Sequence, residues 1–169
     1  MMYLLGVKKL IHIIKWLRPD VLNAVQDLTR HMSVATLCRV KAMKRVMKYL
    51  AMASDQGLLL EPNAKWDSSK EFEFEIAGFL DSDFAKDPAT HKSVSRWAVF
   101  LNGAPILMQS KMQDFTTLSV MEAELVVATT CAQDMLFSMW LLESIGLKVQ
   151  QRSERLGKQL ECGRMHMAQ

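Results

Sequence analysis

The feature that most constrains this chain is a change of hydrophobic period near residue 119. Before that point short apolar–polar alternations, typical of strands, are separated by turn residues, whereas no Gly or Pro occurs between Ser119 and Ile145. Ser119 and Glu122 have capping-box spacing, and Gly146 provides a stop signal. The pattern therefore predicts one long helix, roughly 40 Å in length, after a set of strands.

Three strands are expected before that helix. Glu71–Ile76 alternates strictly, with its Phe and Ile side chains facing inward, and Gly78 marks a bulge or a break before the next apolar stretch. Ser95–Leu101 and Pro105–Ser110 flank Asn102-Gly103, which is a strong hairpin signal. The expected fold class is α/β (α+β), with a three-stranded antiparallel meander followed by a long helix.

Upstream of the strands the hydrophobic spacing is helical. Helices are expected over Val7–Leu17, from Pro19 to about Met32, and from about Thr36 to Met52. The loop Glu61–Lys70, which contains Pro, Asn and Ser, is the expected domain boundary. The chain then divides into a small helical segment over 1–60, a strand-and-helix domain over 71–150 and a tail over 151–169.

Charge is distributed unevenly along the chain. Residues 1–52 hold ten Lys and Arg against two Asp, whereas residues 53–90 hold three Lys against nine Asp and Glu. This asymmetry predicts a surface for a polyanion next to a carboxylate site, and two mutually complementary surfaces are the alternative. The cations of the third helix that would contact a phosphate backbone are Arg39, Lys41, Lys44, Arg45 and Lys48.

Cysteine usage and hydropathy exclude several classes of protein. Cys38, Cys131 and Cys162 are odd in number and widely spaced, which argues against a disulfide framework or zinc site and favours an intracellular, cytoplasmic or nuclear location. The absence of an uncharged run of 18 residues argues against a membrane span. The amphipathic Val7–Leu17 segment leaves docking on a membrane surface as an alternative to packing on the domain.

Three carboxylates are candidates for a metal site. Asp81 and Asp83 lie two apart on a strand, so they share a face, and Glu124 lies on the apolar stripe of the long helix with Cys131 and Met135. Two Mg²⁺ ions roughly 4 Å apart require several carboxylates that converge from rigid elements. A nearby lysine is the alternative partner for Glu124, because an unpaired carboxylate in an apolar stripe is costly.

Several motifs in order resemble one family. Leu118-Ser-Val-Met-Glu-Ala-Glu-Leu125 and Gly78-Phe-Leu-Asp-Ser-Asp-Phe-Ala85 resemble the ribonuclease H domain of copia-type retrotransposon Pol polyproteins. Arg18-Pro-Asp-Val21 and Met43-Lys-Arg-Val-Met-Lys-Tyr49 resemble the end of the reverse transcriptase region and its connection. The resemblance covers about residues 18–150. It implies a ribonuclease H-like fold.

The same resemblance implies a chemistry and a set of roles. The family hydrolyses the RNA strand of RNA·DNA hybrids with Mg²⁺ or Mn²⁺. By this resemblance Asp81 and Glu124 are catalytic metal ligands, and Asp83 is a weaker third candidate. The basic helices would hold the nucleic acid backbone without reading its sequence.

The chain also departs from the pattern of that family. No Asp follows Asp134, so the third catalytic aspartate and its strand are missing, and Arg96 and Trp97 stand where the family usually has Gly-Tyr. Glu161 and His166 are candidate replacement ligands in the tail. The missing strand predicts an incomplete sheet with an exposed edge that favours self-association. One permissible back-translation of residues 153–164, read one nucleotide on, resembles the family's continuation, which is the basis for a frameshift hypothesis.

The sequence therefore predicts a truncated, pseudogene-like fragment of a retrotransposon polymerase with impaired or absent nuclease activity. The alternative is a catalytically dead module that binds nucleic acid or other polymerase segments. The expected partner is an RNA·DNA hybrid or another nucleic acid, and no membrane is expected.

Overall fold

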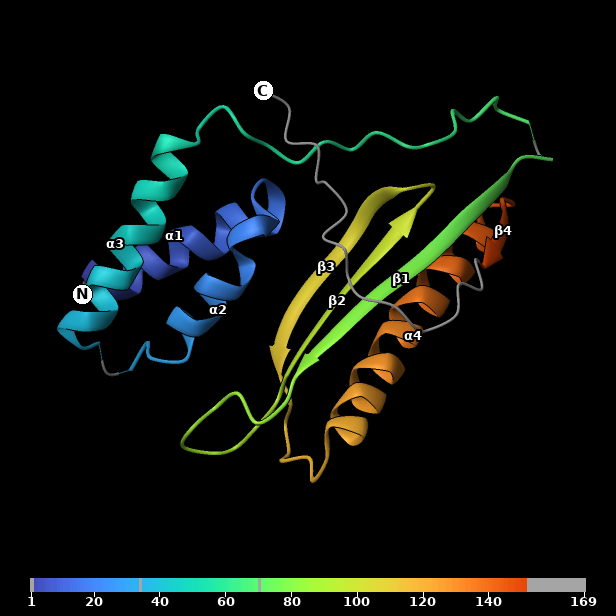
Figure 1. The fold of residues 1–169 in the computed structure, drawn as a ribbon. Helices are drawn as coiled ribbons and strands as arrows, with labels where there is room; N and C mark the ends of the chain where they lie inside the picture. Colours follow the sequence, from blue (N-terminus) through green and yellow to red (C-terminus); the bar gives the residue numbers. More distant parts are fainter. Residues whose placement is uncertain (1, 34, 70, 152–169) are drawn as a thin grey trace. The chain divides into compact units, whose positions relative to one another are not determined.

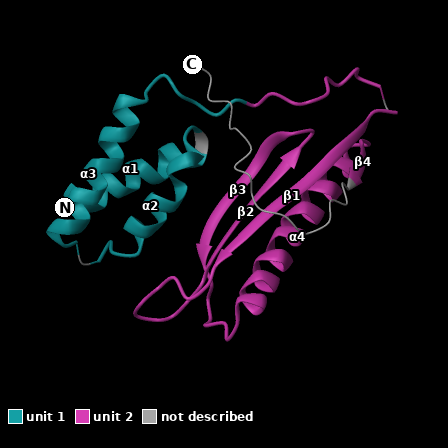
Figure 2. Cartoon of the chain, viewed as in Figure 1, with its two compact units in different colours: residues 1–59, 161–169 teal, residues 60–160 magenta. Residues whose placement is uncertain are grey.

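A computed structural model of the chain describes residues 2–33, 35–69 and 71–151 (Figure 1). Its contacts define two compact units, which we call unit 1, within Met1–Leu59, and unit 2, within Leu60–Leu160 (Figure 2). Of the predicted tail over 151–169, only Gln151 lies inside the described residues, so Glu161 and His166 lie outside them.

Unit 1 is helical, as predicted, with shifted boundaries. It contains α1 (Met2–Trp16), a 3₁₀ turn (Pro19–Val21), α2 (Leu22–Thr29) and α3 (Leu37–Met52). Helix α1 therefore begins five residues before the predicted Val7. Helix α2 ends before the predicted Met32, because the amides of His31 and Met32 bond to carbonyls three residues back and so tighten the last turn.

The three helices of unit 1 enclose one apolar core. Tyr3, Val7 and Leu10 of α1 are buried against residues from α2 and α3. The Tyr3 hydroxyl donates a hydrogen bond to the carbonyl of Leu28 over 2.8 Å. The apolar face of α1 thus lies inside unit 1, where it stabilises the helical packing.

Unit 2 is a mixed sheet with one helix packed against it. It contains β1 (Glu73–Asp83), β2 (Val94–Leu101), β3 (Ala104–Met112), α4 (Val120–Ser144) and β4 (Lys148–Gln151). The strand order is β3-β2-β1-β4, in which β2 is antiparallel to both β1 and β3 and β4 is parallel to β1. The meander and the long helix are confirmed, and the fold is mixed α/β.

The sheet also contains a strand that the sequence did not predict, because β4 follows α4 and pairs with β1 as a fourth strand. Gly146 has φ of +84°, a left-handed conformation that ends α4 and turns the chain back along the sheet. Val149 of β4 then packs against the core of unit 2. The segment Lys-Val-Gln-Gln carries too little apolar alternation to be recognised as a strand from its sequence.

The predicted bulge or break at Gly78 is wrong, because β1 runs through it without interruption. The glycine is required there for close packing of α4. A Cβ atom at Gly78 would lie 2.5 Å from the Met135 Sδ and 2.8 Å from the Cys131 Sγ. Burial raises the pKa of the Cys131 thiol, so this side chain packs as a small apolar group.

We expect Gly78→Ala to lower the free energy of unfolding of unit 2 by about 1–3 kcal/mol, a typical cost of overpacking. The Cβ atom would force the short Cys131 side chain, and with it α4, away from β1. Gly57→Ala is the matched control, because a Cβ atom there meets nothing within 4 Å. Urea denaturation followed by circular dichroism measures both, and equal stability of the two variants would contradict the packing argument.

The predicted turn between β2 and β3 is confirmed. Asn102 and Gly103 have φ of +48° and +82°, the pair of positive values that a tight hairpin requires. Asn102 also ties the turn to β1, because its Oδ1 accepts a hydrogen bond from the Glu75 amide over 2.7 Å. This buried asparagine therefore fixes one end of the meander.

Helix α4 begins with the predicted cap and packs one face on the sheet. The Ser119 hydroxyl accepts a hydrogen bond from the Glu122 amide over 3.1 Å, and the Glu122 carboxylate accepts one from the Leu118 amide over 2.6 Å. Steps of four residues back from Cys131 give the buried positions Val127 and Ala123. The buried stripe thus passes one residue before Glu124 and not through it.

The opposite face of α4 is apolar and exposed. By length and composition α4 could cross a membrane. The sequence argues against a membrane span only because it contains no uncharged run of 18 residues. Core helices of soluble proteins share this length and composition, so the two properties alone do not assign α4 to a membrane. The large apolar side chains exposed on this helix are Val120, Met121, Leu125, Leu136, Phe137, Trp140 and Leu141.

Candidate functional site

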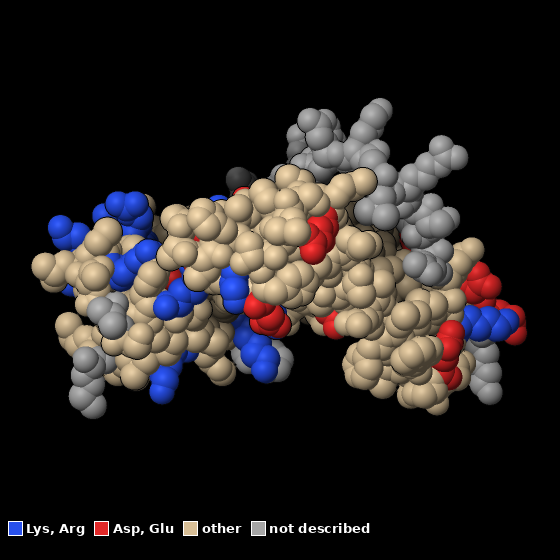
Figure 3. All heavy atoms as spheres, turned by 90° about the horizontal axis from the view of Figure 1, so that it is seen from below, with Lys and Arg blue, Asp and Glu red and all other residues tan. Residues whose placement is uncertain are grey.

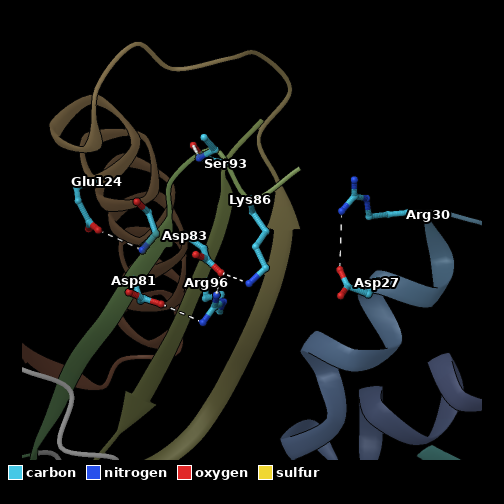
Figure 4. A network of polar contacts seen from close by, with 10 residues as sticks. Asp27, Arg30, Asp81, Asp83, Lys86, Ser93, Arg96 and Glu124 are labelled. Atoms are coloured by element: carbon cyan, nitrogen blue, oxygen red, sulfur yellow. Dashed lines mark hydrogen bonds and ion pairs between the residues drawn. The ribbon is translucent and has the colours of Figure 1, made fainter. Parts of the chain in front are cut away.

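The two aspartates of β1 share a cation from the neighbouring strand. Arg96 of β2 is the direct cross-strand partner of Asp81. Its Nη1 lies 3.1 Å from Oδ2 of Asp81, and its Nη2 lies 2.6 Å from Oδ2 of Asp83 (Figure 4). Asp81 and Asp83 therefore lie on one face of the sheet, as their spacing predicts.

A second cation contacts Asp83. The Lys86 ammonium lies 2.5 Å from Oδ2 of Asp83, just beyond the end of β1. The hydrogen bond from Lys86 holds the pKa of the Asp83 carboxyl below its ordinary value; partial burial opposes this effect, and the charges of Lys86 and Arg96 add to it. Asp83 is therefore ionised at neutral pH and neutralised by side chains of this chain.

Glu124 reaches the same end of β1 from α4. Its Oε1 accepts a hydrogen bond from the Ser82 amide over 3.2 Å (Figure 4). Side chains alternate along a strand, so Ser82 faces α4 together with Gly78, whereas Asp81 and Asp83 face away from the helix. The expected carboxylates are neighbours along β1 but approach it from opposite faces.

This arrangement does not fit a paired magnesium site as it stands. The positive groups next to Asp81 and Asp83 are a guanidinium and an ammonium, and Glu124 is bonded to a backbone amide. Within residues 2–33, 35–69 and 71–151, no group of three or more His, Cys, Asp or Glu side chains could hold a metal ion. Mg²⁺ requires near-octahedral oxygen ligands, which these side chains do not provide together.

The predicted nucleic-acid residues lie on α3. Lys41, Lys44, Arg45 and Lys48 are exposed and follow the spacing i, i+3, i+4, i+7, which places them on one face of the helix. Arg39 is half-buried. Figure 3 shows one face of the molecule, on which Lys and Arg side chains gather over the helices of unit 1.

The apolar residues of α3 explain why these cations point outward. Met43 is buried in the core of unit 1, with Met47 and Leu50 packed against it. Thr36 caps the helix, because its hydroxyl accepts a hydrogen bond from the Arg39 amide over 3.4 Å. The core contacts of one face thus leave the basic stripe, which we define as Lys41, Lys44, Arg45 and Lys48, in solvent.

Sequence reasoning did not assign Arg96 or Lys86 to the site. In the sequence Arg96 is only a departure from a family pattern, and no local signal indicates that it is a partner of Asp81. Its role follows from the register of β1 and β2, in which Asp81 pairs with Arg96 and Asp83 with Val94. That register was not readable, because a loop of ten residues, not a tight turn, joins these strands.

Comparison with known proteins shows that the chain is similar to Pol polyproteins encoded by plant transposons. The chain is 26% identical over 144 residues to the retrovirus-related Pol polyprotein from transposon RE1 of Arabidopsis thaliana, covering 85% of this chain and 9% of that protein. It is 27% identical over 148 residues to the retrovirus-related Pol polyprotein from transposon TNT 1-94 of Nicotiana tabacum, covering 86% of this chain and 10% of that protein.

A shorter relative matches over most of its own length. The secreted RxLR effector protein 161 of Plasmopara viticola is 27% identical over 139 residues, which are 82% of this chain and 90% of that protein. No family model matches the chain, and no solved structure matches it. Over about 85% of its length the chain is therefore similar to transposon-encoded Pol polyproteins, and it spans about a tenth of their length.

Proposed function

We propose that this chain is a fragment of a retrotransposon polymerase that binds nucleic acid through unit 1 and has lost efficient nuclease activity in its ribonuclease H-like unit 2. The basic stripe of α3 is the observation that carries the binding. None of its four side chains forms an ion pair with any part of the chain that the structure describes. Four unpaired cations on one face attract a polyanion without regard to its sequence.

The geometry of the stripe fits a phosphate backbone. Its first and last cations, Lys41 and Lys48, are seven positions apart on α3, so the stripe extends roughly 10 Å along the helix axis. Lys and Arg side chains are long enough to reach phosphates on either side of such a line. Contacts of this kind position a nucleic acid and contribute affinity, but they do not select a base sequence.

We expect the affinity for an RNA·DNA hybrid to fall steeply with salt. Four phosphate contacts predict a slope of about −3 to −4 for log K against log [salt], since each contact contributes roughly −0.9. Lys44→Gln/Lys48→Gln should reduce the magnitude of this slope by about 2. Fluorescence anisotropy of a labelled hybrid over a series of NaCl concentrations measures both values.

A matched control removes the same charge elsewhere. Lys65 and Lys111 are exposed residues of unit 2, so Lys65→Gln/Lys111→Gln should leave the slope unchanged. Equal slopes for the native chain and both double variants would rule out the basic stripe as the binding surface. Cleavage of the hybrid with Mg²⁺, lost in Asp81→Asn, would contradict the proposed loss of nuclease activity.

A further inference from the structure

The position of Arg96 has a consequence of its own, separate from nucleic acid binding. Arg96 contacts both aspartates through different nitrogens, at 3.1 Å from Asp81 and 2.6 Å from Asp83. Its planar fork suits two carboxylate oxygens at once. The guanidinium therefore occupies the position between the two side chains where a metal ion shared by both aspartates would have to bind.

The surroundings add to this effect. Lys86 is bonded to the same oxygen of Asp83 that Arg96 contacts. The two aspartates are thus balanced by two cations at short range. The side chains of Asp81, Asp83 and Arg96 are between 33% and 39% exposed, so dissolved ions could reach them if Arg96 were absent.

We infer that Arg96 is the resident cation of the Asp81–Asp83 pair and keeps divalent metal ions from binding there. Arg96 in this position accounts for the poor fit of the two aspartates to a magnesium site, whatever the basic stripe of α3 binds. Two physical terms contribute to the exclusion. A divalent ion must displace the guanidinium from both carboxylates, and it is repelled by the same charge.

The size of the effect follows from Coulomb's law. Even in a water-like dielectric, a divalent ion and a guanidinium about 5–6 Å apart repel each other by an amount equivalent to roughly tenfold in affinity. Removal of Arg96 should therefore strengthen metal binding by at least about tenfold. The gain should require Asp81, which would lose its cation partner from β2.

The test is Mn²⁺ binding to the full chain, measured by electron paramagnetic resonance of the free ion. We expect at least tenfold tighter binding by Arg96→Ala than by the native chain. Arg96→Lys, which keeps the charge, should stay within about twofold of the native chain. The double variant Arg96→Ala/Asp81→Asn should lose the gain, which assigns the bound ion to this pair.

Two controls separate the effect from general changes in charge or folding. Lys111→Ala removes one positive charge from β3 and should leave Mn²⁺ affinity unchanged. Circular dichroism checks folding, and Arg96→Gln, which is closer to Arg in length and uncharged, replaces Arg96→Ala if the latter does not fold. Unchanged Mn²⁺ affinity in a folded neutral variant, or an equal gain in Lys111→Ala, would overturn the inference.

The outcome is independent of the nucleic acid binding proposed for unit 1. Loss of the salt-dependent hybrid binding would leave the role of Arg96 untouched. Equally, an unchanged Mn²⁺ affinity in Arg96→Ala would leave the basic stripe as the proposed binding surface. A negative result in the hybrid-binding experiment and a negative result in the Mn²⁺-binding experiment can therefore be told apart.

Discussion

The variant Asp20→Asn is expected to lose about 3 kcal/mol of the free energy of unfolding of unit 1, the cost of leaving a buried charge without its partner. Arg18 and Asp20 form a bidentate pair, with hydrogen bonds of 2.9 and 2.8 Å, and their side chains are only 7% and 14% exposed. The Arg18 guanidinium also donates to the Ala53 carbonyl over 2.6 Å, which ties the 3₁₀ turn to the end of α3.

The pH dependence of this effect has a defined sign. The hydrogen bond from Arg18 holds the pKa of Asp20 below its unfolded value of 3.8, with partial burial opposing it. The pair therefore contributes its full stability above about pH 4, and the contribution is lost as the pH falls through the folded pKa. Asp20→Asn should lack this component of acid unfolding.

Thermal or urea unfolding of the native chain and the variant, repeated between about pH 2 and pH 7, measures both effects. Asp27→Asn is the matched control in the same unit, because the Asp27 side chain is 54% exposed and its carboxylate lies 3.8 Å from the Arg30 guanidinium. That control should cost less than about 1 kcal/mol. Similar losses for the two variants would show that burial of the Arg18–Asp20 pair is not what stabilises this unit.

The second large effect is expected for Ile76→Ala, which should destabilise unit 2 by about 2–5 kcal/mol. Ile76 is fully buried and packs with Trp97, Val99, Val127 and Cys131, so the substitution removes three methyl or methylene groups and leaves a cavity. The core of unit 1 consists of other residues. We therefore expect the backbone amides of unit 2 alone to lose protection from hydrogen exchange.

Hydrogen–deuterium exchange with mass spectrometry can resolve the two units. Peptides that cover β2 should exchange faster in Ile76→Ala, whereas peptides that cover α3 should not change. Ile106→Ala provides the control on β3, because Ile106 is 47% exposed and should cost less than about 1 kcal/mol. Faster exchange in both units would contradict two independent cores.

Much of the fold was predictable because its signals are local. The Ser119 cap, the turn at Asn102-Gly103 and the stop at Gly146 each depend on a few adjacent residues whose conformational preferences are strong. The role of Gly78 was misread as a bulge, because the need for glycine arises from α4, which lies about 50 residues further along the chain. The residues next to Gly78 in the strand therefore do not indicate that a glycine is needed there.

The candidate site was predictable only in part for the same reason. The shared face of Asp81 and Asp83 follows from strand alternation alone. The pairing with Arg96 depends on the register across a ten-residue loop, and the contact between Glu124 and Ser82 depends on how α4 lies on the sheet. Long-range geometry therefore decided what the carboxylates contact.

The fourth strand has a consequence for the order of folding. The ladder between β1 and β4 joins Glu73 to Lys148, about 75 positions apart, whereas the meander joins strands that follow one another directly. Closing the larger loop carries the greater entropic cost, and the part of β4 that the structure describes offsets it with four residues. During synthesis the meander and α4 emerge first, so we expect β4 to attach last and to detach first when unit 2 opens.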